Sequence, residues 1–182
     1  MGEQLESISK NLQDFIEKQQ MFFVGTAATD GRVNVSPKGL DSLRILNPNR
    51  VIWLNSTGSG NESAAHILEN PRMTMMFCAF DGAPLILRLF GQARAVHPRD
   101  AEWTQLYAKF NPITGARQIF MLEVDLVQTS CGMAVPLFDF NAQRTELTDY
   151  WEARTPEQLK AYQLKKNTNS IDGFPTNIRG EA

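Results

Sequence analysis

Residues 51 to 62 read Val51-Ile52-Trp53-Leu54-Asn55-Ser56-Thr57-Gly58-Ser59-Gly60-Asn61-Glu62, so an apolar strand-like run ends in a small, glycine-bearing loop and a helix-like segment follows. Such a junction can direct several backbone N–H groups and the positive end of a helix dipole at one phosphate group. A simpler interpretation is a plain helix cap, because Ser59 and Glu62 match the S-x-x-E capping box and the glycines could serve a turn with positive φ. The local sequence leaves both interpretations open.

On both sides of this junction, short strand-like runs alternate with turn residues. Asp30-Gly31 and Asp81-Gly82-Ala83-Pro84 each separate two such runs and are typical of hairpin connections. Gly91 lies inside a strand-like run and indicates a bulge or a close backbone approach. Six or seven short strands joined mainly by hairpins favour a mainly β fold, a closed or nearly closed antiparallel barrel with small helices inserted.

Helices are expected at both ends of the barrel. Apolar residues spaced by three and four predict an amphipathic helix over about residues 3–19. Beyond residue 143 the sequence predicts two exposed helices with Leu147 and Tyr150 among their apolar anchors, the second opened by Thr155-Pro156-Glu157. We expect a single domain over residues 1–182, consisting of an N-terminal helix (1–19), a barrel (20–130) and a helical C-terminal extension with a docked tail (131–182).

The composition indicates an ordinary globular protein. The chain has 182 residues, 42% of them hydrophobic, and its 18 Lys and Arg against 20 Asp and Glu give a net charge of -2 without a block of like charges. Neither a nucleic-acid partner nor an anionic membrane is indicated. Cys78 and Cys131 lie among apolar residues, a pattern typical of buried thiols. No apolar run approaches the roughly 20 residues that are needed to span a bilayer. We expect a cytoplasmic protein.

Few residues are available for acid–base or metal chemistry. The two histidines, His66 and His97, lie near no cysteine and no paired carboxylate, so no metal site is predicted and no catalytic residue can be assigned. Redox chemistry carried by a bound cofactor remains open, since the protein then supplies mainly position and charge. Asn34, Ser36 and Lys38 recur at strand period, so the lysine would hold the anionic edge of a reduced flavin or, alternatively, lie on a solvent-exposed face.

Several motifs along the chain form a set: Phe22-Phe23-Val24-Gly25-Thr26-Ala27, Gly31-Arg32-Val33-Asn34-Val35-Ser36-Pro37-Lys38-Gly39, the loop at 55–62, Asn70-Pro71-Arg72, Arg88-Leu89-Phe90-Gly91, and, toward the end, Cys131-Gly132-Met133-Ala134-Val135-Pro136 and Ser170-Ile171-Asp172-Gly173-Phe174-Pro175. Together they resemble the FMN-binding split barrels related to pyridoxamine 5′-phosphate oxidase. The resemblance covers nearly the whole chain, and the C-terminal motifs look like a branch other than the true oxidase.

The resemblance implies an antiparallel split β-barrel of six or seven strands with short peripheral helices and a helical C-terminal extension. It also implies a homodimer that binds FMN in a cleft between its two subunits. By position, the strand motif would meet the flavin ring, the glycine loop would lie at the ribityl phosphate, and an arginine on a later strand would add a contact. The residues concerned are Ser36, Pro37 and Lys38 for the ring, Asn55, Ser56, Ser59, Asn61 and Glu62 for the phosphate, and Arg88 for the further contact.

Two departures from the oxidase bear on the substrate. The oxidase has Ser-Arg-Lys where this chain has Ser59-Gly60-Asn61, and its C-terminal Arg-Leu-x-Pro segment is absent from residues 178–182. We therefore expect phosphate binding by backbone amides and a substrate other than pyridoxamine phosphate. The resemblance implies an FMN-dependent oxidoreductase that uses a small-molecule electron donor or acceptor. The alternative is a non-catalytic flavin- or haem-binding protein for storage, sensing or scavenging, and a third class is a cofactor-free interaction protein.

Overall fold

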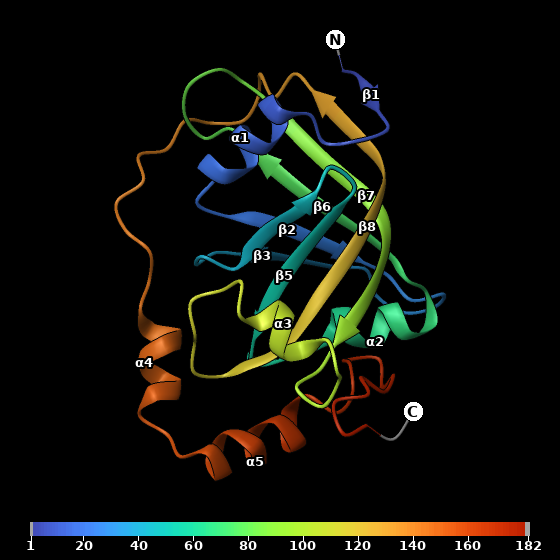
Figure 1. Ribbon diagram of the computed structural model, residues 1–182, viewed down its shortest axis with the longest axis vertical. Coiled ribbons are helices and arrows are strands. Elements are labelled where there is room, and N and C mark those ends of the chain that lie inside the picture. The colour runs from blue at the N-terminus through green and yellow to red at the C-terminus, as the bar shows by residue number, and fades with distance from the viewer. Residues whose placement is uncertain (1, 181–182) are drawn as a thin grey trace.

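The computed structural model describes residues 2–180, so Met1, Glu181 and Ala182 at the ends of the predicted domain lie outside the described residues. One antiparallel sheet of eight strands curves into a split barrel (Figure 1). The strands follow the order β3-β2-β6-β7-β8-β5-β4, and β1 pairs with β8 beside this path. Their bounds are Gln4–Leu5 (β1), Phe22–Thr26 (β2), Asn34–Lys38 (β3), Leu43–Asn47 (β4), Arg50–Ser56 (β5), Arg72–Cys78 (β6), Ile86–Val96 (β7) and Ala116–Ser130 (β8).

The expected hairpins and the role of Gly91 are confirmed. β2 pairs with β3 across the Asp30-Gly31 turn, where Gly31 has a φ of 92°. β6 pairs with β7, and the register of β7 against β8 shifts between Phe90 and Gly91. A Cβ on Gly91 would lie 1.8 Å from the backbone oxygen of Glu123. Only glycine therefore allows β7 and β8 to approach at this bulge.

The helices are α1 (Lys10–Lys18), α2 (Glu62–Glu69), α3 (Trp103–Tyr107), α4 (Glu146–Glu152) and α5 (Pro156–Lys166). The prediction that the first helix begins near residue 3 is wrong. Gln4 and Leu5 instead pair with β8, and the Ser9 side chain accepts a hydrogen bond from the Leu12 N–H and caps α1 there. At α5 the predicted start is confirmed, because Thr155 and Gln158 form a complete capping box.

The barrel interior is filled by apolar side chains from every long strand. Trp53 stacks on Phe120 with ring centroids 4.8 Å apart, and Phe22 stacks on Phe77 at 5.7 Å. Each large apolar side chain that is fully buried contributes about 1.5–3 kcal/mol to stability. This packed interior fixes β5 and β8, the two strands that lead into the glycine loop and face it.

The C-terminal extension leaves the sheet after β8, runs along one side of the barrel, and carries α4, α5 and the tail to the end opposite β1 (Figure 1). Its main anchor is Trp151, which is 1% exposed. Gly115, with a φ of 88°, lies against it, and a Cβ there would come within 2.7 Å of the indole. The expected anchors Leu147 and Tyr150 are about 40% exposed. The prediction that these two residues anchor the helix is wrong, because the face of α4 that packs on the barrel is the one that carries Trp151.

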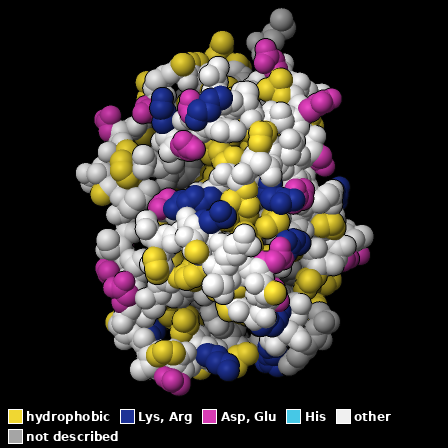
Figure 2. Space-filling view, in the orientation of Figure 1, with side chains coloured by type: hydrophobic (Ala, Val, Ile, Leu, Met, Phe, Trp, Pro, Cys, Tyr) yellow, Lys and Arg dark blue, Asp and Glu magenta, His cyan; other side chains and the backbone are white. Residues whose placement is uncertain are grey.

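The surface carries mixed charge. Figure 2 shows Lys and Arg side chains scattered over one face with acidic side chains among them. No described helix is long and apolar enough to cross a membrane. Cys78 is buried as expected, but Cys131 is exposed because it lies just past the end of β8, where the chain leaves the sheet.

Candidate functional site

A pocket of about 510 Å³ opens where β3, the end of β5, the glycine loop and the start of β8 meet. Most of the side chains assigned to the cofactor from the sequence line it, although they come from segments that are far apart along the chain. Those that line it are Ser36, Lys38, Asn55, Ser56, Ser59, Asn61 and Glu62.

Two assigned residues do not line this pocket. Pro37 lies on the opposite face of β3, since successive side chains on a strand alternate, and it lines a second pocket behind the strand. Arg88 lies on β7, where its Nη1 donates to the Ser130 hydroxyl at 3.0 Å. Seven of the nine assigned residues thus line this pocket, whereas Pro37 and Arg88 do not.

Lys38 is a cation without a counter-ion. β3 continues through Pro37, so Asn34, Ser36 and Lys38 share the face that lines the pocket. The Lys38 ammonium lies 4.8 Å from the centroid of the Trp53 ring and pairs with no carboxylate among the described residues. Burial, and then the positive charge of Arg117, lowers the pKa of Lys38 to about 8. The alternative of an ordinary surface lysine is wrong.

The glycine loop is not a plain helix cap. α2 is capped at Asn61 without a side-chain hydrogen bond, and the Glu62 carboxylate accepts from the Ile171 N–H at 2.9 Å, so the Ser59–Glu62 capping box does not form. Neither Gly58 nor Gly60 has a positive φ. Among the described residues, none accepts a hydrogen bond from the backbone N–H groups of residues 58–63. These amides lie at the positive end of α2, beside the pocket.

Arg117, at the start of β8, is the residue that sequence reasoning missed. It is 5% exposed, lines the pocket, and donates from Nη1 to the Gly60 carbonyl at 2.9 Å. Burial lowers the pKa of Arg117 to about 9, so the guanidinium is still charged at neutral pH. The sequence feature that could have revealed this arginine is Arg117-Gln118, a polar pair immediately before the apolar run of β8.

A buried amide network holds this arginine. The Asn55 Oδ1 accepts from the Arg117 Nε at 3.1 Å and from its Nη2 at 2.5 Å, and Gln118 donates to Asn55 at 3.3 Å and to Asn61 at 2.7 Å. The Asn55 and Asn61 side chains thus position the arginine and the loop. Three of the five guanidinium N–H groups are engaged, which leaves donors for an anion in the pocket.

The C-terminal extension fastens the other side of the loop. The Trp151 indole N–H donates to the Thr57 carbonyl at 2.9 Å, Gln163 donates to the Thr57 hydroxyl at 2.8 Å, and Asn167 donates to the Gly58 carbonyl at 3.0 Å. The loop is therefore held by side chains on both sides while its N–H groups remain available. Such pre-organisation reduces the entropic cost of binding a ligand.

The histidines are buried and inaccessible. The His66 Nδ1 lies 3.1 Å from the Thr26 hydroxyl, and its Nε2 is buried without a partner although the ring borders the pocket. Burial lowers the pKa of His97 to about 4. Within residues 2–180, no group of three or more His, Cys, Asp or Glu side chains is arranged to hold a metal ion.

The sequence model of the pyridoxamine 5′-phosphate oxidase family matches residues 8–131. The chain belongs to this family. A relative from Aspergillus flavus, the pyridoxamine 5′-phosphate oxidase family protein ustO, is 37% identical over 188 residues, which cover 93% of this chain and 76% of ustO. The matched region contains β2 to β8 and the whole pocket except Ile171.

Solved structures agree with the family fold. The crystal structure of a "putative pyridoxamine 5′-phosphate oxidase" from Lactobacillus delbrueckii has a TM-score of 0.55 at 18% identity, and the match covers 68% of this chain and 94% of that one. HupZ from Group A Streptococcus has a TM-score of 0.51 at 18% identity, and the match covers 65% of this chain and 91% of HupZ. At this identity both comparisons bear on the split-barrel fold alone.

Proposed function

We propose that this pocket binds FMN and that the protein is an FMN-dependent oxidoreductase, which passes electrons from a reduced nicotinamide or a small organic donor. The observation that carries the proposal is a pair of cations, Lys38 and Arg117, that line one pocket beside a row of backbone amides. Within residues 2–180, neither cation has a carboxylate partner and the amides have no acceptor. Burying cations in this way costs stability unless an anion joins them.

The phosphate would bind at the glycine loop. Residues 58–63, whose N–H groups have no acceptor among the described residues, and Arg117, which has free donors, line the same pocket at the start of α2. This donor set suits a phosphate monoester, because backbone amides at a helix start and a guanidinium both bind phosphate oxygens. The Ser56 and Ser59 side chains would contribute in the same place, whereas Asn55, Asn61 and Glu62 would hold the loop.

The flavin ring would lie along β3 and Trp53. Bound FMN would supply the capacity to accept and donate electrons, which no side chain of this pocket has. Lys38 would place its positive charge at the ring, and Ser36, whose buried hydroxyl has no partner among the described residues, would offer a hydrogen bond. A positive charge at this position favours the anionic reduced ring over the neutral oxidised ring.

Haem fits this pocket less well. His66 is the one histidine that borders it, and the ring nitrogen that Thr26 leaves free is buried. An iron ligand from a histidine of the described chain is therefore not accessible here. This observation favours flavin.

The proposed assembly is a homodimer. Val33, just before the edge strand β3, and Val35, within it, are 71% and 66% exposed, so they would become buried against a second copy. Arg88, which does not line the pocket of its own chain, would then contribute to the site of the other protomer, and Pro37 would lie behind the ring. The absence of a disulfide between Cys78 and Cys131 is compatible with the proposed cytoplasmic location.

The test compares FMN with riboflavin, which lacks the phosphate. Fluorescence titration of the purified protein should show tight FMN binding and at least 100-fold weaker riboflavin binding. Arg117→Gln should weaken FMN binding about 10- to 100-fold, since a hydrogen bond to a charged group is worth about 1.5–3 kcal/mol, and leave riboflavin binding nearly unchanged. Equal affinity for both ligands would refute the phosphate site. A Soret band after haem addition, without FMN uptake, would favour the haem alternative.

Catalysis is tested separately with the loaded protein. Anaerobic NADH, NADPH or a small panel of organic donors should bleach the flavin absorption within minutes. FMN that binds stoichiometrically but is reduced by none of these donors would favour the non-catalytic flavin-binding alternative.

A further inference from the structure

We infer that a second pocket, behind β3, binds the organic substrate and that it takes an apolar molecule that is neutral or anionic. This inference rests on the proposed function, because it concerns the partner of the proposed flavin. The pocket has a volume of about 640 Å³, within the range of small-molecule sites. Its apolar walls come from Met21, Leu40, Trp53, Phe140 and Leu147.

The two pockets share a wall. Both pockets are lined by Lys38, Trp53, Asn55, Ser56 and Gly58. Pro37 lines the second pocket and not the first. A molecule in the second pocket would therefore lie against the residues that would flank the flavin ring. Proximity of this kind is what an electron-transferring pair requires.

One wall comes from outside the region that the family model matches. Residues 137–147, here called the lid segment, follow residue 131, the last matched residue, and contribute Phe140 and Leu147. Gln143 fastens the lid segment, since its Oε1 accepts from the Leu40 N–H at 3.2 Å and its Nε2 donates to the Gln20 carbonyl at 3.0 Å. The shape of this pocket is thus set by the C-terminal extension.

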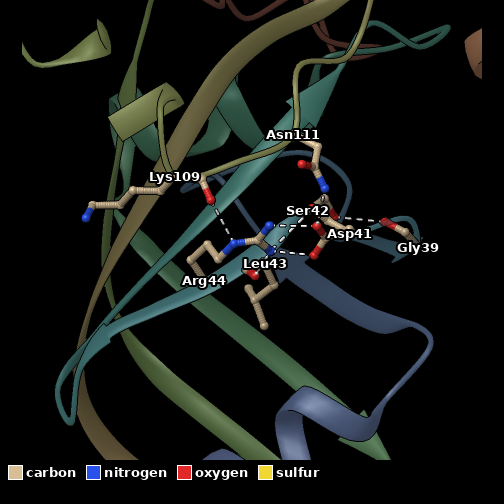
Figure 3. Close-up of polar contacts among 7 residues, drawn as sticks. All are labelled: Gly39, Asp41, Ser42, Leu43, Arg44, Lys109 and Asn111. Carbon is tan, nitrogen blue, oxygen red and sulfur yellow. Dashed lines mark hydrogen bonds and ion pairs between the residues drawn. The ribbon is translucent and has the colours of Figure 1, made fainter. Parts of the chain in front are cut away.

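The turn at residues 39–42 forms another wall of the second pocket, and hydrogen bonds fix it as they fix the lid segment (Figure 3). Ser42 donates its hydroxyl proton to the Gly39 carbonyl at 2.8 Å, and Arg44 binds both carboxylate oxygens of Asp41, at 2.5 and 2.7 Å. Arg44 also donates to the Lys109 carbonyl at 2.9 Å. These hydrogen bonds hold the turn in place, so this wall of the pocket is fixed by contacts within the chain.

The charge of the lining selects the ligand. Among residues 2–180, no aspartate or glutamate lines the second pocket, whereas Lys38 and Arg144 do. Arg144 pairs with Glu146 at 3.0 Å, so Lys38 is the lining cation that has no carboxylate partner among the described residues. Its positive charge disfavours an apolar cation and matches one acidic group. The chemistry therefore favours an apolar molecule with at most one acidic group.

The test uses the aromatic anion 1-anilinonaphthalene-8-sulfonate as a probe of the cofactor-free protein. We expect saturable binding of one probe per protomer, with an at least tenfold preference over a cationic aromatic dye of similar size. Ala142→Trp places an indole in this pocket and should weaken probe binding at least tenfold, whereas Ala134→Trp, also in the C-terminal extension but outside the lining, should not. Leu147→Ala, a milder change, should weaken it about threefold.

FMN titration of the same variants separates this inference from the proposed function. Ala142→Trp and Ala134→Trp should bind FMN like the unmodified protein. Any of three results would overturn the assignment of this pocket. These are unchanged probe binding in both Ala142→Trp and Leu147→Ala, a loss of probe binding in Ala134→Trp equal to that in Ala142→Trp, and a preference for the cationic dye. Failure of FMN to bind, with probe binding still blocked by Ala142→Trp, would refute the flavin proposal and leave the apolar pocket established.

Discussion

Lys38 should make the cofactor-free protein less stable than it would be without this charge. Its pKa is lowered from 10.5 to about 8, mainly by burial. At about 1.4 kcal/mol per pKa unit, the full penalty for keeping the ammonium charged at pH 7 is about 3 kcal/mol. Part of the side chain is in contact with solvent, and the contact with Trp53 is worth about 0.5–1 kcal/mol, so we expect Lys38→Met to raise the free energy of unfolding by about 1–2 kcal/mol.

The contribution of Lys38 to the free energy of unfolding depends on pH, and the lowered pKa fixes its sign. Between pH 8 and pH 10.5 the unfolded chain binds this proton and the folded protein does not, so the stability of the unmodified protein rises with pH across this window. Below pH 8 the penalty is present in full. The advantage of Lys38→Met should therefore be largest at pH 7 and should vanish near pH 10.5.

The assay is urea unfolding of the cofactor-free protein at pH 7, 9 and 10, at one protein concentration, followed by circular dichroism. Lys160→Met, which removes an exposed lysine, is the matched control and should change stability by less than 0.5 kcal/mol. A Lys38→Met protein that is less stable than the unmodified one at pH 7, or an advantage that does not decline with pH, would refute the account of Lys38 as a buried charge without a counter-ion.

Three further predictions concern the site and the frame around it. Lys38→Ala should shift the reduction potential of bound FMN downward more than it weakens FMN binding, as measured by spectroelectrochemistry; an unchanged potential would remove Lys38 from its proposed role. Trp151→Phe removes the hydrogen bond to Thr57 and should weaken FMN binding about three- to tenfold in a fluorescence titration, with a circular dichroism spectrum as the check on folding; equal affinity would show that the loop does not depend on this contact. Gly91→Ala should destabilise the protein by about 3 kcal/mol or more, because its Cβ would lie 1.8 Å from the Glu123 carbonyl, and a loss below 1 kcal/mol in urea unfolding would contradict the close approach.

The sequence by itself determined the fold and the position of the loop. Hairpin turns at Asp30-Gly31 and at 81–84 and the glycine at position 91 act through local backbone geometry, which sequence patterns report directly. The motif set was sufficient for the family, and the strand period alone placed Asn34, Ser36 and Lys38 on one face. The single-domain organisation over residues 1–182 and the cofactor roles of individual residues stay predictions.

Tertiary structure decided what faces the loop. Arg117 reaches Gly60 across β8 and β5, and Trp151 reaches Thr57 over a separation of 94 residues. Long-range contacts also explain two predictions that were wrong. The capping box does not form because Glu62 accepts a hydrogen bond from Ile171 in the tail. The first helix does not begin near residue 3 because β1 pairs with β8 there. Pairing between distant segments depends on how the whole barrel closes, and neither local propensity nor spacing along the chain encodes that closure.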